Sequence, residues 1–239
     1  MSSNFSRARA SAALRRSATT SRKTIGLTHK TASSDWKLET LEPRLLLSGD
    51  LAPGVHALEG SIDQPGEQDR FEFVVTEKTR FLFDGLQGDQ IQWQLKGSNA
   101  TDKFDLRNLT ATGDRFLDLD PGTYNLTVDG IGDRTGVYTF RLIGIEASVP
   151  LAANIATTGI LPAGGQAALY SVNLEAGDRM YFQAASGNGA GTWTMFDPTA
   201  SSVWGQNSLQ SDSGPFVAQR AGTYWMSVEG QSGATTALN

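Results

Sequence analysis

The residue types that carry most enzyme chemistry are scarce in this chain. It has 239 residues, no cysteine and only two histidines, His29 and His56. Both precede the first predicted strand, so neither can serve a Ser-His-Asp triad or a histidine-based metal site within the body of the chain. A Ser-Lys dyad or a pair of carboxylates stays open, but no spacing favours one. The sequence also has no P-loop, dinucleotide glycine fingerprint or zincin motif. We therefore expect no catalytic residues and predict that the chain is not an enzyme.

A group of acidic turn residues is the candidate for cation binding, because calcium prefers clustered oxygen ligands. Their spacing matches no EF-hand or nonapeptide loop, and acidic turns are normally solvated. We expect no cofactor, and calcium is the alternative. The residues concerned are Asp114, Asp118, Asp120, Asp129 and Asp133.

Trp225 is the candidate for ligand contact. If its neighbours Tyr224 and Met226 point inward, strand alternation turns Trp225 outward. An outward tryptophan can stack on a sugar ring or pack against a neighbouring domain. The first outcome predicts a carbohydrate-binding module, and the second predicts a contact between domains.

A repeated block reveals how these residues are positioned. Residues 121–130 and 221–230 share a glycine turn, a tyrosine and alternating apolar positions. A tyrosine at the start of a strand can bury its ring and send its hydroxyl to a nearby backbone carbonyl. We therefore expect structural roles for Gly122, Tyr124, Gly222 and Tyr224.

Apolar residues alternate with period 2 through most of the chain, and turn signals separate the runs. The pattern repeats after about 100 residues, so Trp193 corresponds to Trp93 and Phe216 to Phe116. These aromatics are predicted to lie in two cores. The pattern indicates an all-β chain of two tandem antiparallel jelly-roll-like β-sandwiches. We assign residues 52–146 to the first sandwich, 147–157 to a linker and 158–239 to the second.

The second repeat ends differently from the first. A closing strand of alternating apolar residues is expected after Gly233, but the sequence reads TTALN there. We expect the last strand of the second sandwich to be lacking, which predicts an uncovered sheet edge, a marginal second sandwich and a fragment of a longer protein.

The N-terminal segment has a separate character. Residues 1–34 hold seven Arg and Lys and no acid, whereas 22 Asp and Glu outnumber 11 Lys and Arg from Asp50 onward. We predict a disordered basic leader over residues 1–40. The acidic body argues against a nucleic-acid partner. No segment approaches the apolar length of a Sec signal or a transmembrane helix.

The segment after this leader, residues 41–48, resembles the LEPR-XLL motif of large surface or secreted proteins, chiefly of planctomycetes and related bacteria. The resemblance implies a sorting element and export. The alternative is a short linker whose leucines dock on the first sandwich. The matching positions are Leu41, Glu42, Pro43, Arg44, Leu46 and Leu47, with Leu45 at the free position.

Both repeats resemble the bacterial pre-peptidase C-terminal domain, and the first fits over its whole length. The second departs where Asp69 of the first is replaced by Ala168. The resemblance implies non-catalytic sandwiches that accompany secreted proteases or surface proteins. Its motifs are residues 60–62 and 159–161, 69–73, the Gly-Thr-Tyr strand and 136–140.

Together these features predict a non-catalytic, secreted or cell-surface protein fragment whose sandwiches act as spacers or adhesion modules. Its partners would be extracellular proteins or polysaccharides. The alternative is the accessory region of a secreted hydrolase or protease whose catalytic domain lies beyond the C-terminus. The third candidate is the carbohydrate-binding module that uses Trp225.

Overall fold

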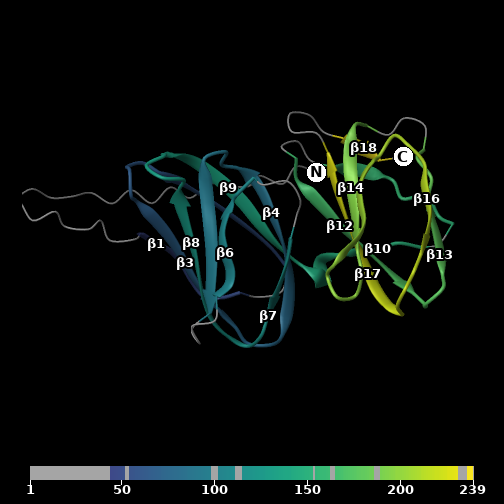
Figure 1. Cartoon of the computed structure of the whole chain (residues 1–239), viewed down its shortest axis with the longest axis horizontal. Coiled ribbons are helices and arrows are strands. Elements are labelled where there is room, and N and C mark those ends of the chain that lie inside the picture. The colour runs from purple at the N-terminus through teal and green to yellow at the C-terminus, as the bar shows by residue number, and fades with distance from the viewer. Residues whose placement is uncertain are drawn as a thin grey trace, which may run out of the picture. The chain divides into compact units, whose positions relative to one another are not determined.

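Two β-sandwiches follow one another in the computed structural model (Figure 1). The structure describes residues 44–51, 54–97, 102–110, 115–152, 154–161, 165–185, 189–230 and 236–238. Within these residues the helical content is a single 3-10 turn, Ile145–Ala147. The prediction of an all-β chain with mainly antiparallel sheets is confirmed. The predicted leader over residues 1–40 lies outside the described residues.

The first sandwich consists of a five-stranded sheet, in the order β1-β3-β8-β5-β6, and a four-stranded sheet, in the order β2-β9-β4-β7. Its neighbouring strands are antiparallel except for β1 and β3, which run parallel. The strands are β1 (Arg44–Asp50), β2 (Val55–Ile62), β3 (Gln68–Val75), β4 (Thr79–Gln87), β5 (Ile91–Gly97), β6 (Asp102–Asn108), β7 (Arg115–Leu119), β8 (Gly122–Gly130) and β9 (Gly136–Gly144).

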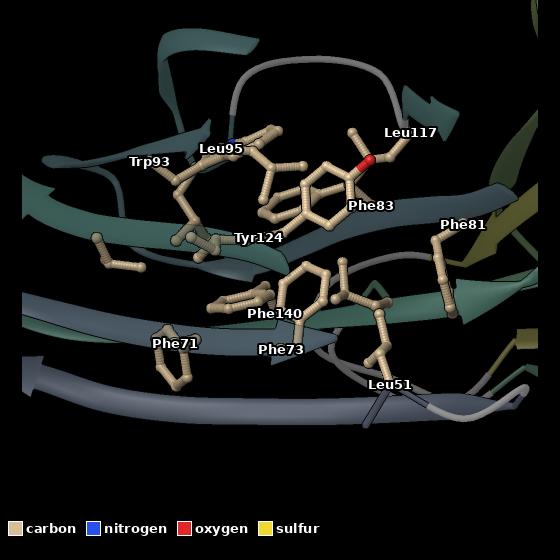
Figure 2. Close-up of a cluster of buried hydrophobic side chains, with 14 of the residues drawn as sticks. Leu51, Phe71, Phe73, Phe81, Phe83, Trp93, Leu95, Leu117, Tyr124 and Phe140 are labelled. Atoms are coloured by element: carbon tan, nitrogen blue, oxygen red, sulfur yellow. The ribbon is translucent and has the colours of Figure 1, made fainter. Parts of the chain in front are cut away.

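Alternation places one face of each sheet in the first core. In β3, Phe71, Phe73 and Val75 are buried. Phe83 stacks on Trp93 across the two sheets, with ring centroids 4.1 Å apart, and on Phe140 at 5.2 Å. Figure 2 shows these aromatic side chains gathered between the ribbons. Burying such large apolar surfaces is the main favourable term in forming this sandwich.

The second sandwich repeats the five-stranded sheet, in the order β10-β12-β17-β14-β15. Its other strands form two separate pairs, β11 with β18 and β13 with β16. The strands are β10 (Val149–Pro150), β11 (Gly159–Leu161), β12 (Ala167–Leu174), β13 (Arg179–Phe182), β14 (Gly191–Phe196), β15 (Ser202–Ser208), β16 (Ser213–Val217), β17 (Gly222–Gly230) and β18 (Thr236–Leu238).

The segment entering each sandwich is a parallel edge strand. β1 runs parallel to β3, and the N–H of Leu51, the residue after β1, donates to the Val74 carbonyl at 2.9 Å. β10 runs along β12, and the Leu151 N–H donates to the Ser171 carbonyl at 2.7 Å. The region assigned as linker, residues 147–157, thus contains a strand bound to the second sandwich. Both sandwiches lie in one compact unit, residues 40–239.

The predicted sorting motif runs into this edge strand. Arg44 pairs with Asp69, and Leu47 pairs with Phe71, in the parallel ladder between β1 and β3. The second half of the motif therefore lies in a strand of the first sandwich. Leu41, Glu42 and Pro43 lie outside the described residues.

The prediction that the second sandwich lacks its last strand is wrong in part. β18 provides the first residues of that strand, because Leu161 pairs with Thr236 as Ile62 pairs with Gly136. Thr236 and Leu238 are both buried. The sequence interpretation overlooked this strand because a threonine stands where the first repeat has Gly136. The sheet is nevertheless divided, since β9 pairs with both β2 and β4 whereas β18 pairs with β11 alone among the described strands.

Candidate functional site: the contact between the two sandwiches

Trp225 points away from the second core, as alternation predicts, but it is not an exposed ligand contact. Its side chain is 7% exposed and belongs to an apolar cluster shared by both sandwiches. Its ring centroid lies 5.6 Å from that of Phe116 on β7 of the first sandwich. The sugar-stacking prediction is therefore wrong, and the domain-packing alternative is confirmed. We define this cluster as the inter-sandwich contact: Leu82, Phe116, Ile143, Ala167, Leu169, Phe196 and Trp225.

Phe116 is the centre of the aromatic part of the inter-sandwich contact. It meets Phe196 edge-to-face, with centroids 5.0 Å apart and planes at 90°. Because Phe116 pairs with Leu82 on β4, both side chains project from the outer face of the four-stranded sheet. The prediction of Phe116 as a core residue of the first sandwich is thus wrong. In the first sandwich Phe81 pairs with Leu117. Met180 is the counterpart of Phe81 in the second sandwich, and it pairs with Phe216. Phe216 therefore corresponds to Leu117 and not to Phe116.

Arg80 lies beside these rings and forms polar contacts with both sandwiches. Its guanidinium lies 4.9 Å from the Trp225 ring centroid, within range of a cation–π interaction. The same group donates to the Pro198 carbonyl at 3.1 Å, and it binds both carboxylate oxygens of Asp118, at 2.5 and 3.0 Å. Asp118 thus holds the planar guanidinium in the orientation that reaches the second sandwich.

A buried ion pair forms the other side of the contact. Asp84 on β4 is 2% exposed, and its Oδ2 accepts two hydrogen bonds from Arg141 on β9, at 2.8 and 2.5 Å. The same oxygen accepts the Ala167 N–H of the second sandwich at 3.2 Å. Arg141 in turn donates to the Ala167 carbonyl at 2.7 Å and to Gln166 Oε1 at 3.1 Å. Asp84 and Arg141 thus both form hydrogen bonds with residues at the start of β12.

Burial and hydrogen bonding shift the pKa of Asp84 in opposite directions. Desolvation raises the pKa of Asp84 above its ordinary value of 3.8, while the charge of Arg141, its hydrogen bonds and the Ala167 amide lower the pKa. The net direction is upward. A buried ion pair of this kind costs desolvation energy and contributes orientation more than stability. Its hydrogen bonds connect the first sandwich to the residues at the start of β12.

The two five-stranded sheets differ on their outer faces. In the second sandwich Phe196 pairs with Trp225, whereas the corresponding pair in the first is Lys96 with Asn125. Lys96 is exposed. At this pair of positions the outer face of the sheet is therefore polar in the first sandwich and apolar in the second.

The sequence contains a signal for this contact. Strands buried on one face alternate, whereas strands covered on both faces carry consecutive apolar residues. β4 contains Phe81, Leu82 and Phe83 in succession, and β7 contains Phe116 followed by Leu117. These consecutive apolar residues indicate that the four-stranded sheet of the first sandwich is buried on both faces.

The predicted role of the repeated tyrosines is confirmed. Tyr124 is buried and its hydroxyl donates to the Asp120 carbonyl at 2.8 Å. The Tyr224 hydroxyl donates to the Arg220 carbonyl at 3.0 Å and accepts the Arg220 N–H at 3.3 Å.

The glycines that precede the two tyrosines both have positive φ. Gly122 and Gly222 have φ of 158° and 140°. The value at Gly222 lies in the left-handed half of φ space that favours glycine.

The core positions of the repeated tryptophans are also confirmed. Trp93 and Trp193 are each 1% exposed. Trp193 packs on Phe182, with centroids 4.7 Å apart, as Trp93 packs on Phe83.

Three of the five acidic residues named as the calcium alternative have other contacts. Asp118 binds Arg80, Asp129 accepts a hydrogen bond from Gln68 at 3.0 Å, and Asp120 lies 3.9 Å from Lys78. Asp133 is exposed, and Asp114 lies outside the described residues. Among the residues that the structure describes, no group of three or more His, Cys, Asp or Glu gathers as a metal site.

Sequence reasoning missed a buried polar pair in the first sandwich. Asp69 is fully buried and accepts the Tyr138 hydroxyl at 2.6 Å. Gly60 faces the pair, and a Cβ there would lie 2.4 Å from the Tyr138 oxygen. By strand register, the second sandwich has Ala168 and Leu238 at these positions. The second sandwich therefore lacks both the carboxylate of Asp69 and the tyrosine hydroxyl that donates a hydrogen bond to it.

This pair predicts a coupled stability effect. Asp69→Ala removes the acceptor of a buried hydroxyl, and Tyr138→Leu removes the donor to a buried carboxylate. Each single variant is expected to lower the free energy of unfolding by about 1–3 kcal/mol. The double variant reproduces the pair of the second sandwich and is expected to cost less than the sum. Urea unfolding of all four proteins measures this, and strict additivity would contradict it.

Comparisons with known proteins give only distant structural similarities. No family model matches the sequence, and no curated protein matches it. One similar solved structure is the pre-peptidase C-terminal domain of a collagenase from Bacillus anthracis, a domain of the kind that the sequence resembles. It is 19% identical and covers 44% of this chain and 99% of that chain, with a TM-score of 0.34.

A second similar structure is the full extracellular region of zebrafish Gpr126/Adgrg6. It is 8% identical and covers 81% of this chain and 34% of that chain, with a TM-score of 0.30. Likenesses of this size assign neither a family nor a function. In the described part of the chain, no helix has the length and apolar character needed to cross a bilayer.

Proposed function

We propose that the chain is a non-catalytic, exported cell-surface module whose two sandwiches act as a stiff spacer or adhesion unit. The observation that carries this proposal is the inter-sandwich contact around Trp225. Two domains joined by a flexible linker move independently by default, whereas an apolar contact with an ordered entry strand resists such motion. A spacer that holds a binding surface away from a cell needs this stiffness.

Export is the second part of the proposal, and it rests on the LEPR-XLL resemblance of residues 41–48. An extracellular protein or polysaccharide is the expected partner class. The alternative is that the chain is the accessory region of a secreted hydrolase or protease. Such a region would also be exported and would also contain no catalytic residues.

The motif can be tested without disturbing the fold. Arg44, Leu46 and Leu47 lie in β1, so replacing them would alter the first sandwich as well as the motif. Glu42 and Pro43 precede β1, so the variant Glu42→Ala/Pro43→Ala changes the motif and leaves the strand intact. In the native cell we expect this variant to accumulate inside, while the wild type is digested by protease added to intact cells.

Glu59→Ala, at an exposed position of β2, is the matched control and should be exported normally. Immunoblots of protease-treated cells and cell fractions measure both variants. Surface exposure of the motif variant at the wild-type level would refute the sorting role. Loss of export in both variants would point to general instability, and melting of the purified proteins would reveal it.

A further inference from the structure

The strands β13 and β16 of the second sandwich are the counterparts of β4 and β7, whose outer face forms the inter-sandwich contact on the first. Met180 pairs with Phe216 as Phe81 pairs with Leu117, so β13 corresponds to β4 and β16 to β7. β13 and β16 lie side by side (Figure 1). The second sandwich therefore has, on its own surface, the counterpart of the face that binds it to the first.

This counterpart face is exposed and largely apolar. Tyr181, at the position of Leu82, is 67% exposed, whereas Leu82 is 0% exposed in the inter-sandwich contact. Tyr181 is also the only exposed aromatic side chain among the residues that the structure describes. Exposed apolar groups that gather on one face mark interaction sites. We call this surface the β13–β16 face, and its exposed side chains are Arg179, Tyr181, Pro215 and Val217.

The inter-sandwich contact shows which chemistry such a face recognises. There the guanidinium of Arg80 lies 4.9 Å from the Trp225 ring centroid, in a cation–π contact. Arg179 has the position of Arg80 on β13. Opposite it on β16 stands Val217, where the first sandwich has Asp118. The cation is thus retained, while the carboxylate that holds it on the first sandwich is replaced by an apolar side chain. A face of this composition suits an aromatic ring.

One exposed ring of this chain can take the place of Trp225, and it lies on the same face. Trp225 itself is buried in its own inter-sandwich contact and is not accessible to a second molecule. Tyr181 is exposed and lies two positions from Arg179 on β13, so both side chains project from one face about 7 Å apart. The β13–β16 face therefore has both halves of a cation–π contact, which makes it complementary to itself.

We propose that the β13–β16 face is a docking surface for a second copy of this chain, in a two-fold symmetric dimer. With the symmetry axis between the two residues, Arg179 of each copy lies over the Tyr181 ring of the other, and the neighbouring apolar side chains add contact around them. The face is small, and interfaces that bury less than about 1,200 Å² are typical of weak complexes. The dimer is therefore expected to form reversibly as concentration rises. It goes beyond the proposed spacer role and does not depend on export.

Sedimentation velocity of the full chain at rising concentration tests the dimer, and the average mass is expected to move from that of a monomer toward twice that value. Tyr181→Arg brings arginines of the two copies together. It should raise the dissociation constant by about tenfold or more, because it replaces attraction by like-charge repulsion. Val137→Arg is the matched control. It adds the same charge at an exposed position of β9 on the first sandwich and should leave the dissociation constant unchanged.

A mixture of two variants tests the pairing itself. In Arg179→Tyr the face carries two rings, and in Tyr181→Arg it carries two cations, so across a two-fold contact each ring of one variant meets a cation of the other. The mixture should form a heterodimer at least as tight as the wild-type dimer, as measured by fluorescence anisotropy of one labelled variant. A wild-type chain that stays monomeric at every concentration, a mixture that binds no better than Tyr181→Arg alone, or equal weakening by Val137→Arg would each overturn the proposal.

Amide spectra of the wild-type chain locate the contact without any substitution. The signals of β13 and β16 should shift as concentration rises, and those of β2 and β9 should not. Shifts confined to other strands would place the dimer contact elsewhere and contradict the site. If melting curves reveal that a variant fails to fold, the spectra and the sedimentation of the wild-type chain still decide the matter.

Discussion

Trp225→Asn is expected to uncouple the two sandwiches. Asparagine is the residue at the corresponding position of the first sandwich, Asn125, so the change suits the strand and removes only the outward ring. The ring is 7% exposed and lies under Phe116 and Arg80. Loss of a buried tryptophan costs about 3–5 kcal/mol. We expect the free energy of unfolding to fall by that amount and the unfolding curve to separate into two transitions.

Two measurements distinguish uncoupling from general damage. Small-angle scattering should report a larger radius of gyration for the variant, while amide spectra of each core remain native. Asn125→Ala, on the polar outer face of the first sandwich, is the control and should change stability by less than about 0.5 kcal/mol. An unchanged radius of gyration with a single cooperative transition would contradict the role of Trp225 in holding the sandwiches together.

Features whose partners lie close in sequence were predicted correctly. The hydroxyls of Tyr124 and Tyr224 bond to carbonyls only four residues upstream, so the local turn determines the contact. Alternation likewise placed Trp93 and Trp193 inside and turned Trp225 outward, because the side-chain period of a strand is fixed.

Contacts between distant residues could not be predicted in the same way. The outward direction of Trp225 followed from its strand, but its cover by Phe116, 109 positions earlier, depends on how two folded sheets meet. Phe116 itself was misplaced because the repeat distance is 99 rather than 100 at this strand. A shift of one residue moves a side chain to the other face of a sheet. Sequence spacing alone does not reveal such a shift.

Arg141→Met is expected to be the most damaging single change on the polar side of the inter-sandwich contact. It keeps most of the side-chain length but leaves the carboxylate of Asp84 buried without its cation. Breaking a buried pair in this way costs about 3–5 kcal/mol, mainly through the charge left behind. The double variant Asp84→Leu/Arg141→Met removes both charges and should recover much of the loss. Failure of the double variant to recover would show that Arg141 acts through Gln166 and Ala167 instead.

The pH dependence of this variant tests the charge directly. The pKa of Asp84 is raised in the folded state by burial, so folded protein binds the proton more tightly than unfolded protein does. Its contribution to stability is therefore present below the ordinary pKa of 3.8 and is lost as pH rises through the raised value. Arg141→Met removes the positive charge that lowers this pKa, so the loss extends to higher pH. Urea unfolding should show a larger destabilisation at pH 7 than at pH 4. Equal destabilisation at the two pH values would mean that the buried charge of Asp84 is not its cause.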